Sequence, residues 1–191
     1  MKLPFDLIVL DLETTGENNH HRIVEIGAVR LDETLEIVDE YEALVDGRPM
    51  TKAASSVNHI TDEMLAGKPK WNEAYAPWVE WCRKSEKYVL SSFGTYFDLA
   101  VLRDEFERYN LKYPHPGAAL DAKGAIWWEL LKQGYPAVHL SLGQVVEIFR
   151  IPVEGVAHRA LSDAKATARA LKACLKPASK PMLTWKREEL F

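Results

Sequence analysis

The sequence has little cysteine, no long apolar run and no excess of positive charge. Its 191 residues include 2 Cys, and the 24 Lys and Arg are outnumbered by 28 Asp and Glu. The two cysteines, Cys82 and Cys174, fit neither a disulfide scaffold nor a metal-ligand pattern, and we expect both thiols to be buried and reduced. The net charge of −4 excludes a histone-like polycation, but a local basic rim would still suit an enzyme that acts on nucleic acid.

The sequence also shows no pattern typical of a targeting segment or of a membrane-spanning segment. Pro4, Asp6 and Asp11 interrupt any signal-peptide core near the first residue, and no apolar run approaches the roughly 18 residues that a membrane span needs. We therefore expect no membrane contact and a cytoplasmic location. Hydrophobic residues make up 47% of the chain and charged residues 27%, which are globular proportions, and the length suits one domain with a short appendage.

The first quarter of the chain predicts an antiparallel β-meander. Residues 7–10 form a short apolar run typical of a strand that is buried on both faces. Residues 23–31 and 36–45 predict two further strands. Turn-forming residues lie between the three segments, at 16–19 and 32–34, and links this short favour antiparallel pairing.

Helices predominate in the rest of the chain, which gives an α/β protein. Thr61 is a candidate N-cap of a short helix, because Asp62 and Glu63 follow in its first turn. Helical spacing predicts longer helices over 71–84, 97–109, 122–131, 140–149 and 159–175, with a short strand at 88–90. We expect a domain over residues 1–175 and a C-terminal tail over 176–191. The four cationic side chains of that tail either bind a polyanion or are simply solvated.

Asp11 and Glu13 lie two residues apart at the end of the first predicted strand. Side chains of a strand alternate between its faces, so both carboxylates are expected on one face. Like charges this close repel each other unless a cation lies between them, and Mg²⁺ or Mn²⁺ prefers carboxylate oxygen ligands. The same pair also suits a solvated turn, so it does not identify a metal site by itself.

Two other acidic residues and a histidine lie at helix starts. Asp98 lies at the start of the strongest predicted amphipathic helix. It is a candidate functional carboxylate, and the alternative is that it only complements the helix dipole. Phe97 beside it either packs in the core or stacks on a base. Asp163 lies on the flank of the last helix's apolar stripe, which predicts incomplete solvation. His158 precedes that helix, and histidine is either a capping or surface residue there or a general base near neutral pH.

These motifs occur together and in order. Asp11-Leu12-Glu13-Thr14-Thr15-Gly16 is followed by Phe97-Asp98 and then by His158-Arg159-Ala160-Leu161-Ser162-Asp163. The set resembles the DEDDh family of 3′→5′ exonucleases, a branch of the ribonuclease H-like superfamily, whose motifs are Asp-x-Glu, a central Asp and His-x-x-x-x-Asp. Residues 23–29 and 59–61 resemble further segments of that family. The resemblance implies a ribonuclease H-like fold, with a mixed five-stranded sheet that begins as an antiparallel meander and is flanked by helices.

The resemblance also implies roles for particular residues. Two divalent ions, Mg²⁺ with Mn²⁺ as a substitute, would be held by four carboxylates: Asp11, Glu13, Asp98 and Asp163. His158 would accept the proton of the attacking water. Thr14 and Thr15 would contact the terminal 3′-hydroxyl, Phe97 is a candidate for stacking, and Arg159 is a candidate for a phosphate contact. The implied reaction releases 5′-mononucleotides from the 3′ end of single-stranded RNA or DNA.

Two departures from the family leave the substrate open. Glu17 stands where the family often has a Leu that wedges against the terminal base. Residues 91–98 look like those of RNA-trimming members, whereas residues 11–16 look like those of polymerase-proofreading members. The alternatives are therefore an RNA-trimming enzyme, a DNA proofreading or repair exonuclease, and a non-catalytic nucleic-acid-binding or protein-binding module that keeps the fold.

Overall fold

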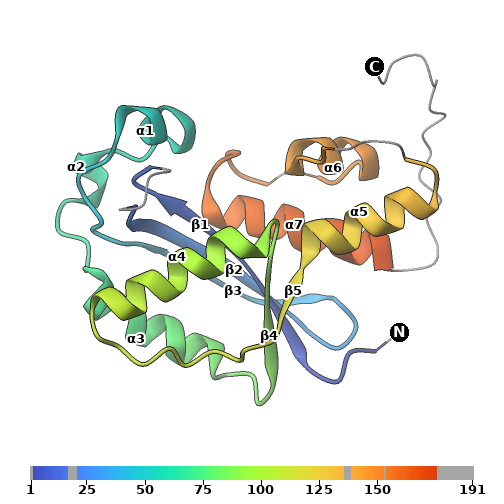
Figure 1. The fold of residues 1–191 in the computed structure, drawn as a ribbon, viewed down its shortest axis with the longest axis horizontal. Coiled ribbons are helices and arrows are strands. Elements are labelled where there is room, and N and C mark those ends of the chain that lie inside the picture. The colour runs from blue at the N-terminus through green and yellow to red at the C-terminus, as the bar shows by residue number, and fades with distance from the viewer. Residues whose placement is uncertain (1, 17–20, 136–138, 153, 176–191) are drawn as a thin grey trace.

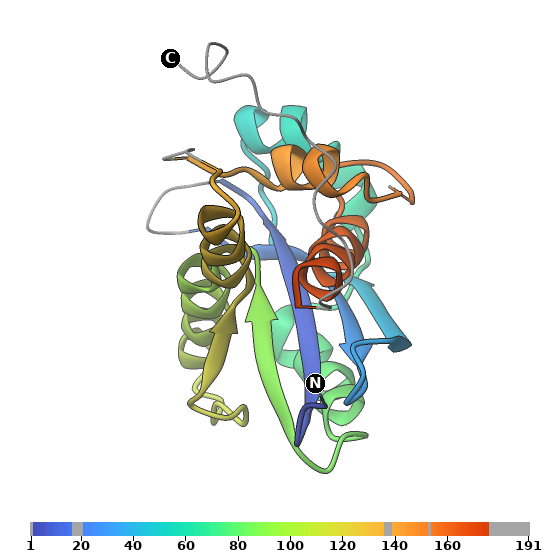
Figure 2. The same ribbon diagram turned by 90° about the vertical axis from the view of Figure 1, so that its right-hand side faces the viewer.

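The computed structural model describes residues 2–16, 21–135, 139–152 and 154–175, and it consists of a sheet flanked by helices (Figures 1 and 2). The strands are β1 (Asp6–Thr14), β2 (Ile23–Leu31), β3 (Ile37–Leu44), β4 (Tyr88–Ser92) and β5 (Ala119–Asp121). The helices are α1 (Lys52–Asn58), α2 (Asp62–Leu65), α3 (Trp71–Cys82), α4 (Thr95–Arg108), α5 (Ala122–Lys132), α6 (Leu142–Phe149) and α7 (Ala160–Leu175).

The five strands lie in the order β3-β2-β1-β4-β5. β1 pairs antiparallel with β2, which pairs antiparallel with β3, whereas β4 and β5 extend the sheet in parallel with β1. This confirms the predicted antiparallel meander and the mixed five-stranded sheet. The carboxyl ends of β1, β4 and β5 point the same way, and α4 and α5 begin where β4 and β5 end (Figure 1).

Alternating side chains of β1 divide the interior into two hydrophobic cores. Ile8 and Leu10 contribute to the core that contains residues of α3 and α4, and Leu7 and Val9 contribute to the core that contains residues of α5, α6 and α7. All four side chains are fully buried. A strand covered on both faces needs this continuous apolar run, which is why the sequence pattern identified it.

Two elements were not expected from the sequence. α1 is rich in serine and contains Val57, so its intrinsic helix propensity is modest. It forms because the Thr51 side chain accepts a hydrogen bond from the Ala54 amide and because the Ser55 hydroxyl donates to the Ile60 carbonyl. β5 has only three residues and exists through its parallel pairing with β4.

Several smaller expectations have clear outcomes. Thr61 is the N-cap of α2, since its side chain accepts a hydrogen bond from the Met64 amide, as predicted. Cys82 is buried, but Cys174 is partly exposed, so the expectation of two buried thiols is right for only one of them. Glu17 and the tail over 176–191 lie outside the described residues. Within the described part of the chain, no helix has both the length and the apolar character to cross a membrane.

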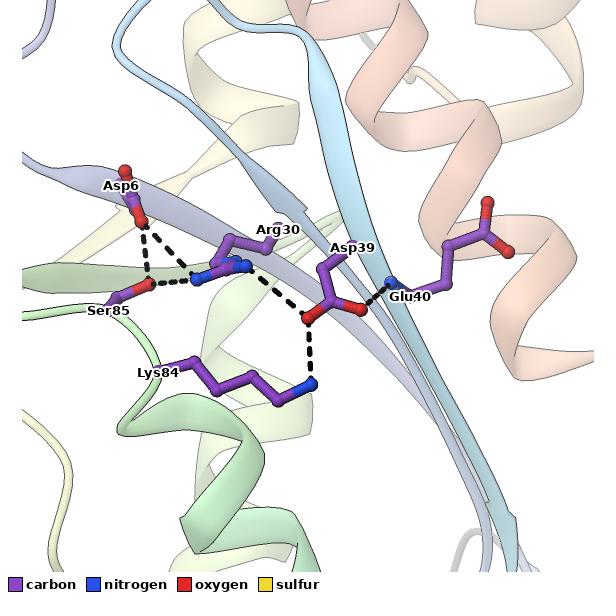
Figure 3. Close-up of polar contacts among 6 residues, drawn as sticks. All are labelled: Asp6, Arg30, Asp39, Glu40, Lys84 and Ser85. Carbon is purple, nitrogen blue, oxygen red and sulfur yellow. Dashed lines mark hydrogen bonds and ion pairs between the residues drawn. The ribbon is translucent and has the colours of Figure 1, made fainter.

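A charged network ties three strands together at the amino-terminal end of β1 (Figure 3). Arg30 of β2 lies 3.3 Å from Asp39 of β3 and 3.9 Å from Asp6 of β1. The Ser85 hydroxyl donates to Asp6 at 2.7 Å, and Lys84 lies 3.0 Å from Asp39. Because Arg30 contacts both carboxylates, it is the centre of the network.

Replacing Arg30 with Ala should lower the free energy of unfolding by about 1–3 kcal/mol, because two carboxylates lose their shared cation in a partly buried setting. Urea denaturation followed by circular dichroism measures this. Lys84→Ala is the matched control, since Lys84 contacts the same Asp39 from a more exposed position and should cost no more than about 1 kcal/mol. Equal losses in the two variants would contradict the central place of Arg30.

Candidate active site

Three carboxylates converge where β1 ends and α7 begins. Asp11 and Glu13 come from β1, and Asp163 comes from the first turn of α7. One oxygen of each lies within 4.8 Å of those of the other two, and all three residues are partly exposed. The alternation of β1 puts Asp11 and Glu13 on the side of Leu7 and Val9, which is the side that α7 covers.

Asp98 lies next to this group rather than within it. It occupies the first turn of α4, which begins after β4, and it is only 5% exposed. Its charge acts on Asp11, since Asp98 is one of the groups that raise the pKa of Asp11. Asp98 thus lies in the first turn of a helix, as predicted, and is buried beside the acidic group rather than solvated.

Each carboxyl group of the site has a raised pKa when no cation is bound. Burial, followed by the charges of Asp98, Glu13 and Asp163, raises the pKa of Asp11 well above its ordinary value. Burial raises the pKa of Glu13 to about 8 and that of Asp98 to about 6. Among the described residues, no ion pair joins a Lys or Arg to any of the four carboxylates. Crowded carboxylate oxygens without a protein cation suit a hard divalent metal ion.

His158 lies at the surface beside Asp163. Its backbone has a φ of 60°, in the left-handed region that non-glycine residues rarely adopt. Burial raises the pKa of Asp163, while the imidazole and the backbone amide of His158 lower it. The imidazole is therefore close enough to interact with the acidic group and exposed enough to exchange protons with water.

A pocket of about 520 Å³ adjoins the acidic group. Its lining consists of Leu12, Glu13, Thr14, Gly16, Thr51, Ala53, Ala54, Val57, Asn58 and Phe97. Glu13 belongs to both the pocket and the acidic group, so the two are continuous. Phe97 is 36% exposed, and its ring centroid lies 5.6 Å from that of His21. The interpretation of Phe97 as a core residue is therefore wrong.

Thr14 and Thr15 shape the turn at the end of β1 beside this pocket. The Thr14 hydroxyl donates to the Gly16 carbonyl at 2.8 Å, and the Thr15 hydroxyl accepts from the Arg22 amide at 3.0 Å. Both threonines are almost fully buried. Their side chains are thus engaged within the protein.

Two residues of the site were missed by sequence reasoning. Asn58 is 2% exposed, its side chain lies 3.5 Å from the Thr14 carbonyl, and its amide lowers the pKa of Glu13 against the effect of burial. Glu25 is fully buried and accepts hydrogen bonds from Arg159 at 3.0 and 3.1 Å. Arg159, the candidate for a phosphate contact, thus forms an internal ion pair with Glu25. A lone Glu inside the apolar run 23–29 was the available signal.

Comparison with known proteins places this architecture in a family. The family profile RNase_T, described as "Exonuclease", matches residues 8–171. The chain belongs to this exonuclease family. Its site therefore lies in an exonuclease domain, which confirms the predicted exonuclease family, and the predicted ribonuclease H-like fold is confirmed as well.

Curated relatives of this chain include DNA polymerase III proteins. It is 29% identical over 172 residues to the DNA polymerase III subunit epsilon of Pasteurella multocida, covering 85% of this chain and 65% of the relative. It is 26% identical over 178 residues to the PolC-type DNA polymerase III of Lacticaseibacillus paracasei, covering 92% of this chain and 12% of the relative. The exonuclease thus spans less than two thirds of the length of either relative.

A solved structure shows the same fold. The nuclease domain of 3′hExo, a DEDDh family member bound to rAMP, aligns with a TM-score of 0.75 at 22% identity. The alignment covers 90% of this chain and 92% of that one. The agreement extends over nearly the whole described sheet and its helices.

Proposed function

We propose that this exonuclease releases 5′-mononucleotides one at a time from the 3′ end of a single-stranded nucleic acid. The observation that carries the proposal is the continuity between the acidic group and the pocket. Glu13 lies within 4.8 Å of Asp11 and Asp163 and also lines the pocket with Phe97. A nucleotide seated in the pocket has its phosphodiester beside the carboxylates.

The metal would be held by the four carboxylates, Asp11, Glu13, Asp98 and Asp163, and we propose two Mg²⁺ ions, for which Mn²⁺ would substitute. Their number matches the charge, since four carboxylates balance two divalent cations. Bound there, the ions would supply an ionised water and would stabilise the attacking and leaving oxygens during hydrolysis.

The remaining residues bind and orient the substrate. Thr14 lines the pocket, and Thr14 and Thr15 are the residues that we propose to contact the terminal 3′-hydroxyl. The Asn58 side chain lowers the pKa of Glu13 and so partly offsets the effect of burial, which favours the charged form that binds a metal ion. His158, exposed beside Asp163, accepts the proton of the attacking water.

The pocket favours an unpaired terminal base. Phe97 offers an exposed ring for stacking, and base–aromatic stacking requires a base that has left its duplex. Ala53, Ala54 and Val57 of α1 supply further apolar contact, and Val57 is 51% exposed. We propose that this part of α1 replaces the family's leucine wedge.

DNA is the substrate that we favour over RNA. The observation behind this choice is that both curated relatives are DNA polymerase III proteins, at 29% and 26% identity. An RNA-trimming role is the second candidate, because the 3′hExo domain with the same fold is bound to rAMP. The chemistry of the acidic group is the same for both.

A single gel experiment tests the reaction, its polarity and its substrate. A 5′-labelled single-stranded DNA oligomer and its RNA equivalent are incubated with the protein in Mg²⁺, in Mn²⁺ and in EDTA. With either metal we expect a ladder of products that shorten stepwise from the 3′ end, and we expect DNA to be digested faster than RNA. In EDTA we expect no digestion. Full activity in EDTA would contradict metal dependence.

Two matched substrates serve as controls in the same gel. A 3′-phosphorylated oligomer should resist digestion, because the site is proposed to bind a free 3′-hydroxyl. A circular single strand should remain intact. Internal cuts in the circle would show an endonuclease instead, and faster digestion of RNA would favour the second candidate.

A further inference from the structure

The first turn of α7 lies directly against the backbone of β2 at Gly27. A Cβ atom built on Gly27 would be 2.0 Å from the Leu161 nitrogen and 2.2 Å from the Ala160 carbonyl carbon. Only glycine permits an approach this close. Gly27 is also the β2 partner of Asp11, so the helix start is held opposite a carboxylate of the site.

Two residues away on the same face of β2, Glu25 binds the start of the same helix. Its carboxylate accepts the Ala160 amide at 2.9 Å and also forms a forked ion pair with the Arg159 guanidinium. The amides of a first helical turn lack partners within the helix and need an external acceptor. In α5 and α6 that acceptor is the side chain of the helix's own N-cap, Asp121 or Ser141, whereas in α7 it is the carboxylate of Glu25, 135 residues away from Ala160.

The two contacts fix the chain between His158 and Asp163. Arg159 follows His158 directly, and Ala160 is the first residue of α7. His158 itself has a left-handed backbone and an exposed side chain, and its backbone amide contacts Asp163 in the first turn of the same helix. The position of its imidazole relative to the acidic group is set by the residues that come after it.

We propose that Glu25, through its ion pair with Arg159 and its bond to the Ala160 amide, is a positioning residue that sets the direction of His158 and Asp163. The proposal rests on the role of His158 and Asp163 under the proposed function. We call the unit formed by Glu25, Gly27, Arg159 and Ala160 the α7 seat. Neither Glu25 nor Arg159 needs to touch the substrate to fulfil this role.

The charges of the α7 seat also balance each other beside the metal site. Glu25 is the β2 partner of Glu13, so its negative charge lies next to the acidic group. Arg159 compensates that charge. Removing the charge of Arg159 leaves an additional anion near the carboxylates, and removing that of Glu25 leaves a cation there. The two changes should therefore shift divalent metal affinity in opposite directions.

The test compares three variants of the full chain: Glu25→Gln, Arg159→Gln and Arg159→Lys. Both Gln variants should lower kcat on a single-stranded oligomer by about 100-fold at unchanged KM, because misplaced groups affect the chemical step rather than substrate binding. Calorimetry with Mn²⁺ alone should show affinity about three- to tenfold tighter for Arg159→Gln and weaker by a similar factor for Glu25→Gln. Arg159→Lys should restore metal affinity but only part of kcat, since an ammonium cannot form the forked pair.

Lys172→Gln is the matched control. It removes an ion pair between α7 and Glu36, away from the helix start, and should leave kcat, KM and Mn²⁺ affinity unchanged. Hydrogen exchange of the metal-free proteins supplies a readout independent of activity. Amides of residues 158–163 should exchange faster in both Gln variants than in the wild type and in Lys172→Gln.

The outcomes separate this proposal from the proposed function. Normal kcat in Glu25→Gln, metal affinities that move in the same direction, or unchanged exchange at 158–163 would each overturn the positioning role. So would a loss of kcat that merely follows the folded fraction measured by circular dichroism. If the wild type itself hydrolysed no oligomer, the proposed function would fail, while exchange and calorimetry would still decide whether the α7 seat exists.

Discussion

Replacing Asp11 with Asn should abolish hydrolysis and at the same time raise the melting temperature of the metal-free protein. Hydrolysis is lost because the site loses the carboxylate that lies among all the others, next to Glu13, Asp98 and Asp163. Stability rises because burial and these neighbouring charges raise the pKa of Asp11, so its ionised form opposes folding. The amide has a similar shape and no charge.

The sign of the pH dependence follows from the same groups. An unfolded chain releases the Glu13 proton near 4.5, whereas the folded metal-free protein holds it to about 8 because the group is buried. The folded state therefore binds more protons between these values, and stability falls as the pH rises from about 4.5 to about 8. Asp11, whose pKa is also raised, adds to this fall in the wild type and not in the variant.

Differential scanning fluorimetry in EDTA measures the effect at pH 6 and pH 8. We expect Asp11→Asn to melt at least about 2–4 °C above the wild type at pH 8, which corresponds to about 1 kcal/mol in a domain of this size. Mg²⁺ should raise the wild-type melting temperature and leave that of the variant nearly unchanged. A less stable variant at pH 8 would show that Asp11 is held by favourable contacts rather than by a metal ion.

His158→Ala and Asp163→Asn should separate proton transfer from metal binding. Asp163→Asn removes one anion from a group whose oxygens lie within 4.8 Å, so metal affinity and turnover should fall together. His158→Ala leaves the four carboxylates in place, and Mn²⁺ affinity should change little. Turnover should nevertheless fall by roughly 10²–10⁴-fold, the usual contribution of a positioned general base.

Calorimetry with Mn²⁺ and the oligomer assay, performed on the same preparations, give the two quantities. His139→Ala is a suitable control, since it removes another exposed histidine of this chain and should alter neither. If His158→Ala kept normal turnover, or lost metal binding as severely as Asp163→Asn, His158 would be only a residue of the helix start and not the base.

Several features of the fold and site were predictable because they depend on neighbours in sequence. The run over residues 7–10 is apolar because β1 is covered on both faces, and the turns between β1, β2 and β3 are short enough to require antiparallel pairing. Asp11 and Glu13 had to share a face because a strand alternates. Thr61 was predictable as the N-cap of α2, because its hydroxyl can accept from a first-turn amide and acidic residues follow it.

Other features depend on partners that are distant in sequence. β5 is a strand only because β4 offers an edge, and α1 is a helix with little propensity of its own. The exposure of Phe97 depends on what packs around the start of α4, and helical spacing alone could not distinguish the pocket from the core.

Local sequence was sufficient to predict most of the helices and strands in their order, the three acidic motifs and the family that these motifs indicate. The pairing of Arg159 with Glu25 and the close approach of α7 to Gly27 are visible only in the folded protein. The physical reason is the separation in sequence over which each kind of interaction acts. Periodicity and capping act over a few residues, whereas a buried charge takes whichever counter-charge the fold brings to it, here from 134 residues away.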